Sequence, residues 1–255
     1  MHKKIIYILF FITTVTFSQS DRNAYKSGEW LKFRMHYGII NAGYATIEIE
    51  DFNEKDRDAF HVVGKGWTTG ITKFFFKVKD NYQTWFYKDD SKPFHFRRRV
   101  DEGGHIISRD IYFDQDGKSA LIKDHKYKKE KTMAINNVQD MISSFYLLRS
   151  HDISNIKINE EIKLMMFFDY ETYDFRMRYL GDEIISSKFG KIKCHKFRPL
   201  VQSGRVFEAE ESLTVWVTAD HNKIPIRIKA NLAIGSLKAD LHEFKGLANP
   251  FNIIY

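Results

Sequence analysis

Apolar and polar residues alternate with a period of two along much of the chain. Residues 31–37 (LKFRMHY) show the pattern clearly, and it recurs in residues 45–49, 173–179, 213–218 and 224–228. A period of two gives a strand one apolar and one wetter face, as antiparallel sheets require. Matching this template along the chain predicts about a dozen strands.

Short runs rich in Gly, Asn and Asp separate the predicted strands at hairpin spacing. These residue types tolerate the positive φ angles of tight turns. We therefore expect the chain to reverse at residues 41–43, 103–104, 116–117, 181–182, 189–190 and 220–222. The fold class that follows is mainly β, with a single antiparallel sheet.

One segment, residues 137–150 (NVQDMISSFYLLRS), has a helical period instead. Its apolar side chains at helical spacing are Val138, Met141, Ile142, Phe145 and Leu148. Asn137 is the expected N-cap, and Arg149 suits the negative end of the helix. We predict one amphipathic helix that packs in the concave face of a curved sheet or open β-barrel.

Residues 1–18 (MHKKIIYILFFITTVTFS) form a separate unit at the N-terminus. Two lysines precede an apolar run that ends at Phe17, and small residues occupy positions −3 and −1 before Gln19. These features predict a secretory signal peptide cleaved near Gln19. An uncleaved anchor and a buried helix are the alternatives, but the run is short for a membrane span. We expect a periplasmic protein with one β-rich domain over residues 19–255 and no transmembrane span after cleavage.

Charge and cysteine content add little that is specific. The formal net charge is +7, and acids and bases are interspersed as on a solvated surface. A weak attraction to anionic lipid headgroups or lipopolysaccharide phosphates is the alternative. A nucleic-acid partner does not fit with export. The single cysteine, Cys194, excludes an intramolecular disulfide and is predicted to be a small buried hydrophobe rather than a reactive thiol.

No motif specifies a reaction or a cofactor. Residues 114–117 (DQDG) match a calcium loop only in part, because the glycine comes too early, and a hairpin turn explains them better. The ten histidines lack metal-site spacing. Ser143 and Ser144 lie on the predicted helix without a GxSxG elbow. We therefore predict no cofactor and no metal, and a non-enzymatic protein.

Aromatic residues are the main excess in composition, at 15%. Most belong in the core, but Trp85 and Trp216 fall on the face opposite the clearest apolar stripe. Arg98 lies in a run of three arginines, where alternation points it away from its neighbours, toward solvent or an anionic headgroup. With Met141 and Phe145 of the helix, these three residues are the candidate ligand-binding set.

Four short motifs occur in an order that resembles a known family. Residues 28–43 resemble its Gly-Glu-x-Leu strand and the glycine turn that follows, and residues 140–149 its Asp-x-x-Ser-x-x-Tyr-x-x-Arg helix. Residues 213–225 resemble its Trp-x-x-x-Asp strand and hairpin, and residues 234–241 its closing Gly-Ser strand. The family is DUF 3108, a bacterial domain of unknown function. The resemblance implies an exported β-rich domain and assigns no catalytic residue.

By fold analogy, the nearest architecture is the half-barrel of Lol-type lipoprotein carriers. The leading hypothesis is a non-enzymatic periplasmic protein that holds a lipid-like or other apolar ligand inside the curl and serves envelope maintenance. The alternative is an envelope module whose sheet edge or aromatic face binds another protein. A hydrolase of envelope glycans or esters is the third hypothesis.

Overall fold

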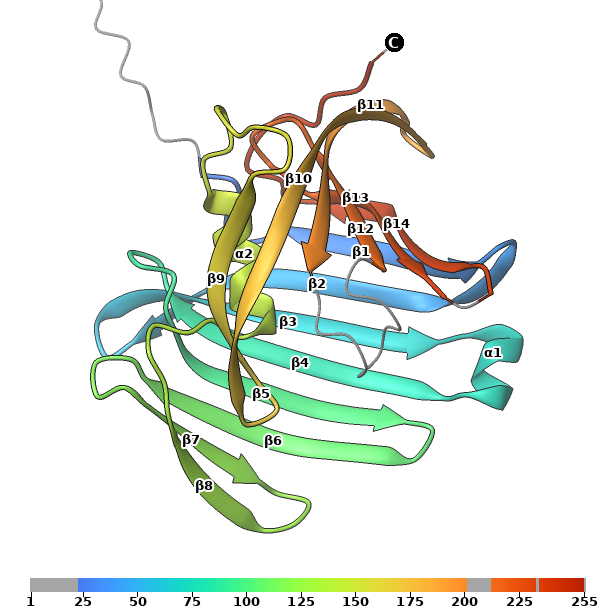
Figure 1. Ribbon diagram of the computed structural model, residues 1–255. Coiled ribbons are helices and arrows are strands. Elements are labelled where there is room, and N and C mark those ends of the chain that lie inside the picture. Colours follow the sequence, from blue (N-terminus) through green and yellow to red (C-terminus); the bar gives the residue numbers. More distant parts are fainter. Residues whose placement is uncertain (1–22, 201–211, 233, 255) are drawn as a thin grey trace, which may run out of the picture.

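The computed structural model describes residues 23–200, 212–232 and 234–254, and the predicted signal peptide and its cleavage site lie outside them. Fourteen antiparallel strands form one sheet, with two helices (Figure 1). The elements are β1 (Trp30–Tyr37), β2 (Ile40–Glu54), β3 (Arg57–Thr68), α1 (Gly70–Phe75), β4 (Val78–Tyr87), β5 (Pro93–Glu102), β6 (His105–Asp114), β7 (Ser119–Asp124), β8 (Lys129–Ala134), α2 (Met141–Ser150), β9 (Glu161–Phe168), β10 (Glu171–Ser187), β11 (Gly190–Leu200), β12 (Leu213–Thr218), β13 (Pro225–Asn231) and β14 (Ser236–Lys245).

The sheet curls strongly but does not close, which confirms the predicted curved antiparallel fold. Its strand order is β8-β7-β6-β5-β4-β3-β2-β1-β14-β13-β12-β11-β10-β9, so β8 and β9 are the edges. Strands β9 and β10 cross in front of β2 to β5 and enclose the concave face (Figure 1). Edge strand β9 is bridged by the segment before α2, where the Gln139 N–H donates to the Met165 carbonyl at 2.8 Å.

Two predicted reversals are wrong. Residues 41–43 lie inside β2, and the chain turns at residues 38–39 instead. Gly43 is needed there for close approach, because a Cβ atom would lie 2.2 Å from the Trp67 carbonyl oxygen. Gly181 lies inside β10, where its φ of +102° accompanies a register shift rather than a turn. The other four reversals occur as predicted.

Helix α2 begins later than predicted, and its cap is a different residue. Asp140, not Asn137, is the N-cap: its carboxylate accepts from the backbone N–H groups of Ile142 and Ser143, and the Ser143 hydroxyl accepts from the Asp140 N–H. This is a capping box. Asn137 has a φ of +48°, which no helical residue adopts. The one-turn helix α1 is an addition that the sequence pattern did not predict.

Asp140 also attaches α2 to the sheet. Its second carboxylate oxygen accepts from the Thr84 hydroxyl of β4 at 2.5 Å, and the side chain is fully buried. Burial raises the pKa of Asp140 to about 6, although the hydrogen bonds from Thr84, Ser143 and Ile142 favour the charged form.

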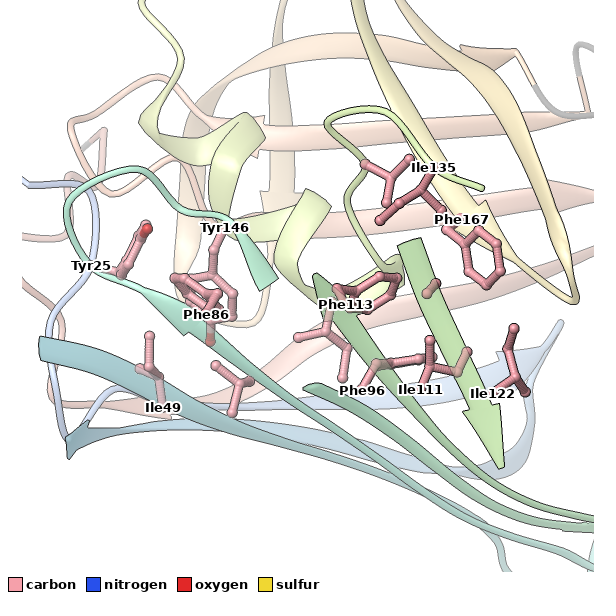
Figure 2. Packing of buried hydrophobic residues seen from close by; sticks show 14 of the residues in the cluster. Tyr25, Ile49, Phe86, Phe96, Ile111, Phe113, Ile122, Ile135, Tyr146 and Phe167 are labelled. Atoms are coloured by element: carbon pink, nitrogen blue, oxygen red, sulfur yellow. The ribbon is translucent and has the colours of Figure 1, made fainter. Parts of the chain in front are cut away.

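Helix α2 packs in the concave face, as predicted. Tyr146 is fully buried, with its ring 4.7 Å from Tyr25 and 5.7 Å from Phe86 (Figure 2). Phe145, the preceding residue of the helix, packs against both this cluster and a second one that contains Cys194. Cys194 is buried, as predicted, and burial raises the pKa of its thiol to about 12.

A buried ion pair holds the far end of α2. Arg149 donates to both carboxylate oxygens of Glu29, at 2.5 and 2.8 Å. The two side chains are 3% and 0% exposed. The same guanidinium donates to the backbone carbonyls of Asn222 and Ala24, at 3.0 and 2.9 Å. Glu29 and Arg149 belong to two of the four motifs noted above, which the fold brings together.

We predict that Glu29→Gln lowers the free energy of unfolding by about 3–5 kcal/mol, because it leaves the Arg149 charge buried without its partner. Urea unfolding measures the loss. Glu243→Gln is the control, since it breaks an exposed, solvent-screened pair with Lys32 and should cost far less stability. The double variant Glu29→Leu/Arg149→Met should lose less unfolding free energy than the sum of the losses of Glu29→Leu alone and Arg149→Met alone, because it leaves no charge buried without a partner. A loss for Glu29→Gln no larger than that of the control would contradict this prediction.

A second prediction concerns pH. The raised pKa of Asp140 means that the folded state binds a proton more tightly than the unfolded state does. The stabilisation from this group is therefore fully present below the ordinary pKa of 3.8 and is lost as pH rises through about 6. The stability advantage of wild type over Asp140→Asn should shrink by about 2 kcal/mol between pH 4 and pH 7.

Denaturant titrations at several pH values measure this difference, with Asp116→Asn in the exposed β6–β7 turn as the matched control. An advantage that grows as pH rises would show that the hydrogen bonds to Asp140 outweigh its burial.

Candidate functional site

A cavity of about 430 Å³ lies between α2 and the half of the sheet formed by β9 to β13. On the helix side, Met141, Phe145 and Leu148 line it, because their spacing places them on one face of α2. On the sheet side, alternate residues of β12 point inward: Leu213, Val215 and Val217. The remaining apolar lining residues are Ile153, Ile162, Met166, Phe175, Met177, Phe197, Pro199, Pro225 and Ile228.

Three lining residues are polar: Ser144, Arg149 and Lys223. The Ser144 hydroxyl donates to the Met141 carbonyl at 2.9 Å, and Arg149 is occupied by Glu29 and two carbonyls. The cavity is therefore apolar with few polar groups, which is typical of small-molecule sites.

Lys223 is the cation best placed to meet a bound molecule. It lies in the turn between β12 and β13 with a φ of +47°, and its ammonium donates to the His151 carbonyl at 2.5 Å. An ammonium has three donors, and His151 is the single hydrogen-bond acceptor for it among the described residues. Burial lowers the pKa of Lys223, although Asp152 nearby opposes the shift.

The structure places two of the five predicted site residues, Met141 and Phe145, on the cavity wall. Trp85 lies elsewhere. It stands on the face of β4 that points away from α2, with its ring stacked between His61 and His95 at centroid distances of 4.3 and 4.4 Å. Its neighbour Thr84 contacts Asp140 of α2, so strand alternation alone directs Trp85 to the outer face.

Trp216 is also outside the cavity, because it alternates with Val215 and Val217 along β12. Its indole N–H donates to Glu183 at 3.0 Å, and its ring belongs to the cluster around Cys194. The opposite face of this strand is thus a second packed surface rather than a ligand wall.

Arg98 is buried away from the cavity, in an internal strand rather than at a sheet edge. It pairs with Asp169 at the tip of the β9–β10 hairpin, and its guanidinium lies 4.4 Å from the centre of the Phe168 ring. The expectation that Arg98 faces solvent or a headgroup is not met by this geometry. As alternation predicts, Arg97 and Arg99 point the other way, and both donate to Asp110.

Sequence reasoning missed most of the sheet side of the cavity. The alternation along β12 showed that Leu213, Val215 and Val217 share one face of the strand. Nothing in that pattern identified α2 as the element across the cavity. Lys223 was missed because a lysine in a turn is usually solvated. Within the described part of the chain, no three His, Cys, Asp or Glu side chains are grouped to hold a metal ion. Neither described helix is long and apolar enough to cross a membrane.

Several solved structures are similar to this chain over most of its length. A β-barrel-like protein of the domain of unknown function DUF1849 from Brucella abortus has a TM-score of 0.56 at 11% identity, covering 87% of this chain and 98% of its own. A candidate lipoprotein from Parabacteroides distasonis has a TM-score of 0.38 at 10% identity, covering 86% of this chain and 96% of its own. A candidate exported protein from Bacteroides fragilis has a TM-score of 0.32 at 9% identity, covering 87% and 97%. The first of these shows a common fold and no common function.

None of the curated proteins compared with the chain matches it. Residues 32–242 match the family model described as a protein of unknown function, DUF3108. The match covers the motif residues on α2 and β12 and most of the sheet, which agrees with the resemblance found in the sequence. The chain belongs to the DUF3108 family.

Proposed function

We propose that this protein is an exported, non-enzymatic protein of the cell envelope that holds an apolar, lipid-like ligand between α2 and strands β9 to β13. The cavity there carries the proposal: about 430 Å³ of space is lined by fifteen apolar residues and three polar ones. Ligand pockets span about 300–1,000 Å³ and have mostly apolar walls with a few polar groups.

Incomplete packing supports this proposal. Protein interiors are ordinarily close-packed, and an unfilled cavity costs stability. Here Phe145 and Met141 of α2 face the cavity, while Tyr146 on the other side of the helix packs tightly on its neighbours. One face of the helix thus packs in the core, and the other lines the apolar cavity.

Lys223 suggests which end of a ligand is polar. Its ammonium is the cation at the cavity wall that is not held in an ion pair with a carboxylate among the described residues. An anionic headgroup beside it would gain a charge-assisted hydrogen bond while the apolar part lies against Phe145, Phe175 and Phe197. We therefore propose an amphiphile with one anionic group.

Export rests on the N-terminal sequence, whose basic, apolar and small-residue regions are those of a signal peptide. A non-enzymatic role is supported by the helix serines. The Ser143 hydroxyl belongs to the capping box, and the Ser144 hydroxyl donates to a backbone carbonyl. Neither is paired with a histidine base among the described residues, as a serine nucleophile requires.

A neutral environment-sensitive dye, Nile red, should bind the native protein, and Met141→Trp should weaken that binding by about 10-fold or more, because the larger ring enters the cavity. Fluorescence titration measures it. Val215→Phe should act in the same way from the sheet side. Ile184→Trp, at an exposed position outside the cavity, is the control. Thermal unfolding checks that each variant is folded, and a folded wild type that binds no dye would refute the ligand-carrier role in favour of a protein-interaction module.

The anionic-group proposal has its own test. Lys223→Met should weaken binding of an anionic amphiphile such as oleate by about 10-fold, because a hydrogen bond to a charged group contributes about 1.5–3 kcal/mol. Nile red binding should stay unchanged. Lys26→Met, at an exposed lysine outside the cavity, is the control. Equal losses for oleate and Nile red would show that Lys223 supports the cavity wall rather than a headgroup.

A further inference from the structure

One end of the sheet carries most of the exposed apolar side chains. Four connections meet there, β1–β2, β3–β4, β5–β6 and β13–β14, because antiparallel strands in this order return at the same side (Figure 1, right). Of the eighteen large apolar residues that are exposed in the described part of the chain, eleven lie in or next to these four connections.

Folding does not account for these side chains. Phe74 and Phe75 of α1 are 91% and 84% exposed, Ile39 in the β1–β2 turn is 95% exposed, and Ile234 before β14 is 81% exposed. Helix α1 has no buried residue at all. Single exposed apolar residues are ordinary, but a group of large ones marks an interaction surface.

The four connections form one continuous surface. The Thr69 N–H before α1 donates to a carbonyl of β2 at 3.1 Å, and the Gly103 N–H of the β5–β6 turn donates to the Lys77 carbonyl after α1 at 2.8 Å. The Tyr37 hydroxyl at the end of β1 donates to the Ile234 carbonyl at 2.9 Å. These bonds hold the turns side by side, so their apolar tips are presented together.

The connections themselves carry lysines but no acid, while Asp101 and Glu102 stand at the end of β5, directly before the β5–β6 turn. The segment around α1 carries Lys73 and Lys77. The β7–β8 turn, which follows in strand order on the same side, adds the exposed Lys126, Lys128 and Lys129. Lys77 lies 3.7 Å from Asp101, so its charge is partly balanced.

We propose that this end of the sheet docks on the anionic surface of a phospholipid bilayer. Phe74, Phe75, Ile39 and Ile234 enter the boundary between headgroups and acyl chains, and the lysines meet the lipid phosphates. The form of the surface favours a bilayer over a protein partner: its apolar groups stand almost fully exposed on separate turns, whereas protein interfaces gather such groups in packed central pockets.

This proposal does not depend on a ligand in the cavity. The cavity is lined from α2 and β9 to β13, and none of the docking side chains contributes to it. Nile red binding and membrane binding can therefore fail independently.

Vesicle co-sedimentation of the protein purified after export tests the proposal. Wild type should bind vesicles of phosphatidylethanolamine and phosphatidylglycerol. The variant Phe74→Ser/Phe75→Ser should bind at least about 10-fold more weakly, because two phenyl rings no longer leave water. Lys73→Gln/Lys77→Gln should weaken binding to these vesicles by about 10-fold and lose the salt dependence of that binding in part.

The control is Ile158→Ser/Ile184→Ser, which removes two exposed apolar side chains elsewhere on the molecule and should leave vesicle binding unchanged. Because all these side chains are exposed, each variant should keep the thermal stability of wild type. Equal vesicle binding by the phenylalanine variant and wild type would overturn the proposal. So would a wild type that ignores vesicles but self-associates through Phe74 and Phe75 in sedimentation equilibrium, since the surface would then serve contact between copies.

Discussion

The buried ion pair between Glu29 and Arg149 is the constraint on which the interior depends. One guanidinium ties the last turn of α2 to the residue before β1, and also to the carbonyls of Ala24 and Asn222. A buried charge that loses its partner is strongly unfavourable, so these segments are stable only when they are assembled together. The pair thereby fixes the C-terminal end of α2 against the segment before β1 and the turn between β12 and β13.

One face of α2 holds the helix in place, and the other lines the cavity. Asp140, Ser143, Tyr146 and Arg149 recur at every third position and make the cap, the core contact and the ion pair. These are the residues of the Asp-x-x-Ser-x-x-Tyr-x-x-Arg motif, and all four are buried. The contacts of the motif residues therefore explain how the helix is attached to the sheet, and they do not point to a reaction. Three apolar residues outside the motif, Met141, Phe145 and Leu148, face the cavity from the same helix, together with Ser144 and the motif residue Arg149.

Two apolar surfaces of different kinds coexist in this molecule. The cavity lies between α2 and the sheet, whereas the turn end presents single side chains on protruding connections. The sheet separates them, since α2 lies in its concave face and the turns lie at the ends of its strands (Figure 1).

The sequence by itself determined the fold class, the central helix and the buried cysteine, because period-two and helical spacing are local and follow from backbone geometry. It also directed Arg98 away from its neighbours. Tertiary structure decided what each side chain meets: Arg98 meets Asp169, Trp85 meets two histidines, and Lys223 reaches the cavity. Alternation gives only the face of a strand, and in a sheet that curls back over itself either face can meet protein or open space.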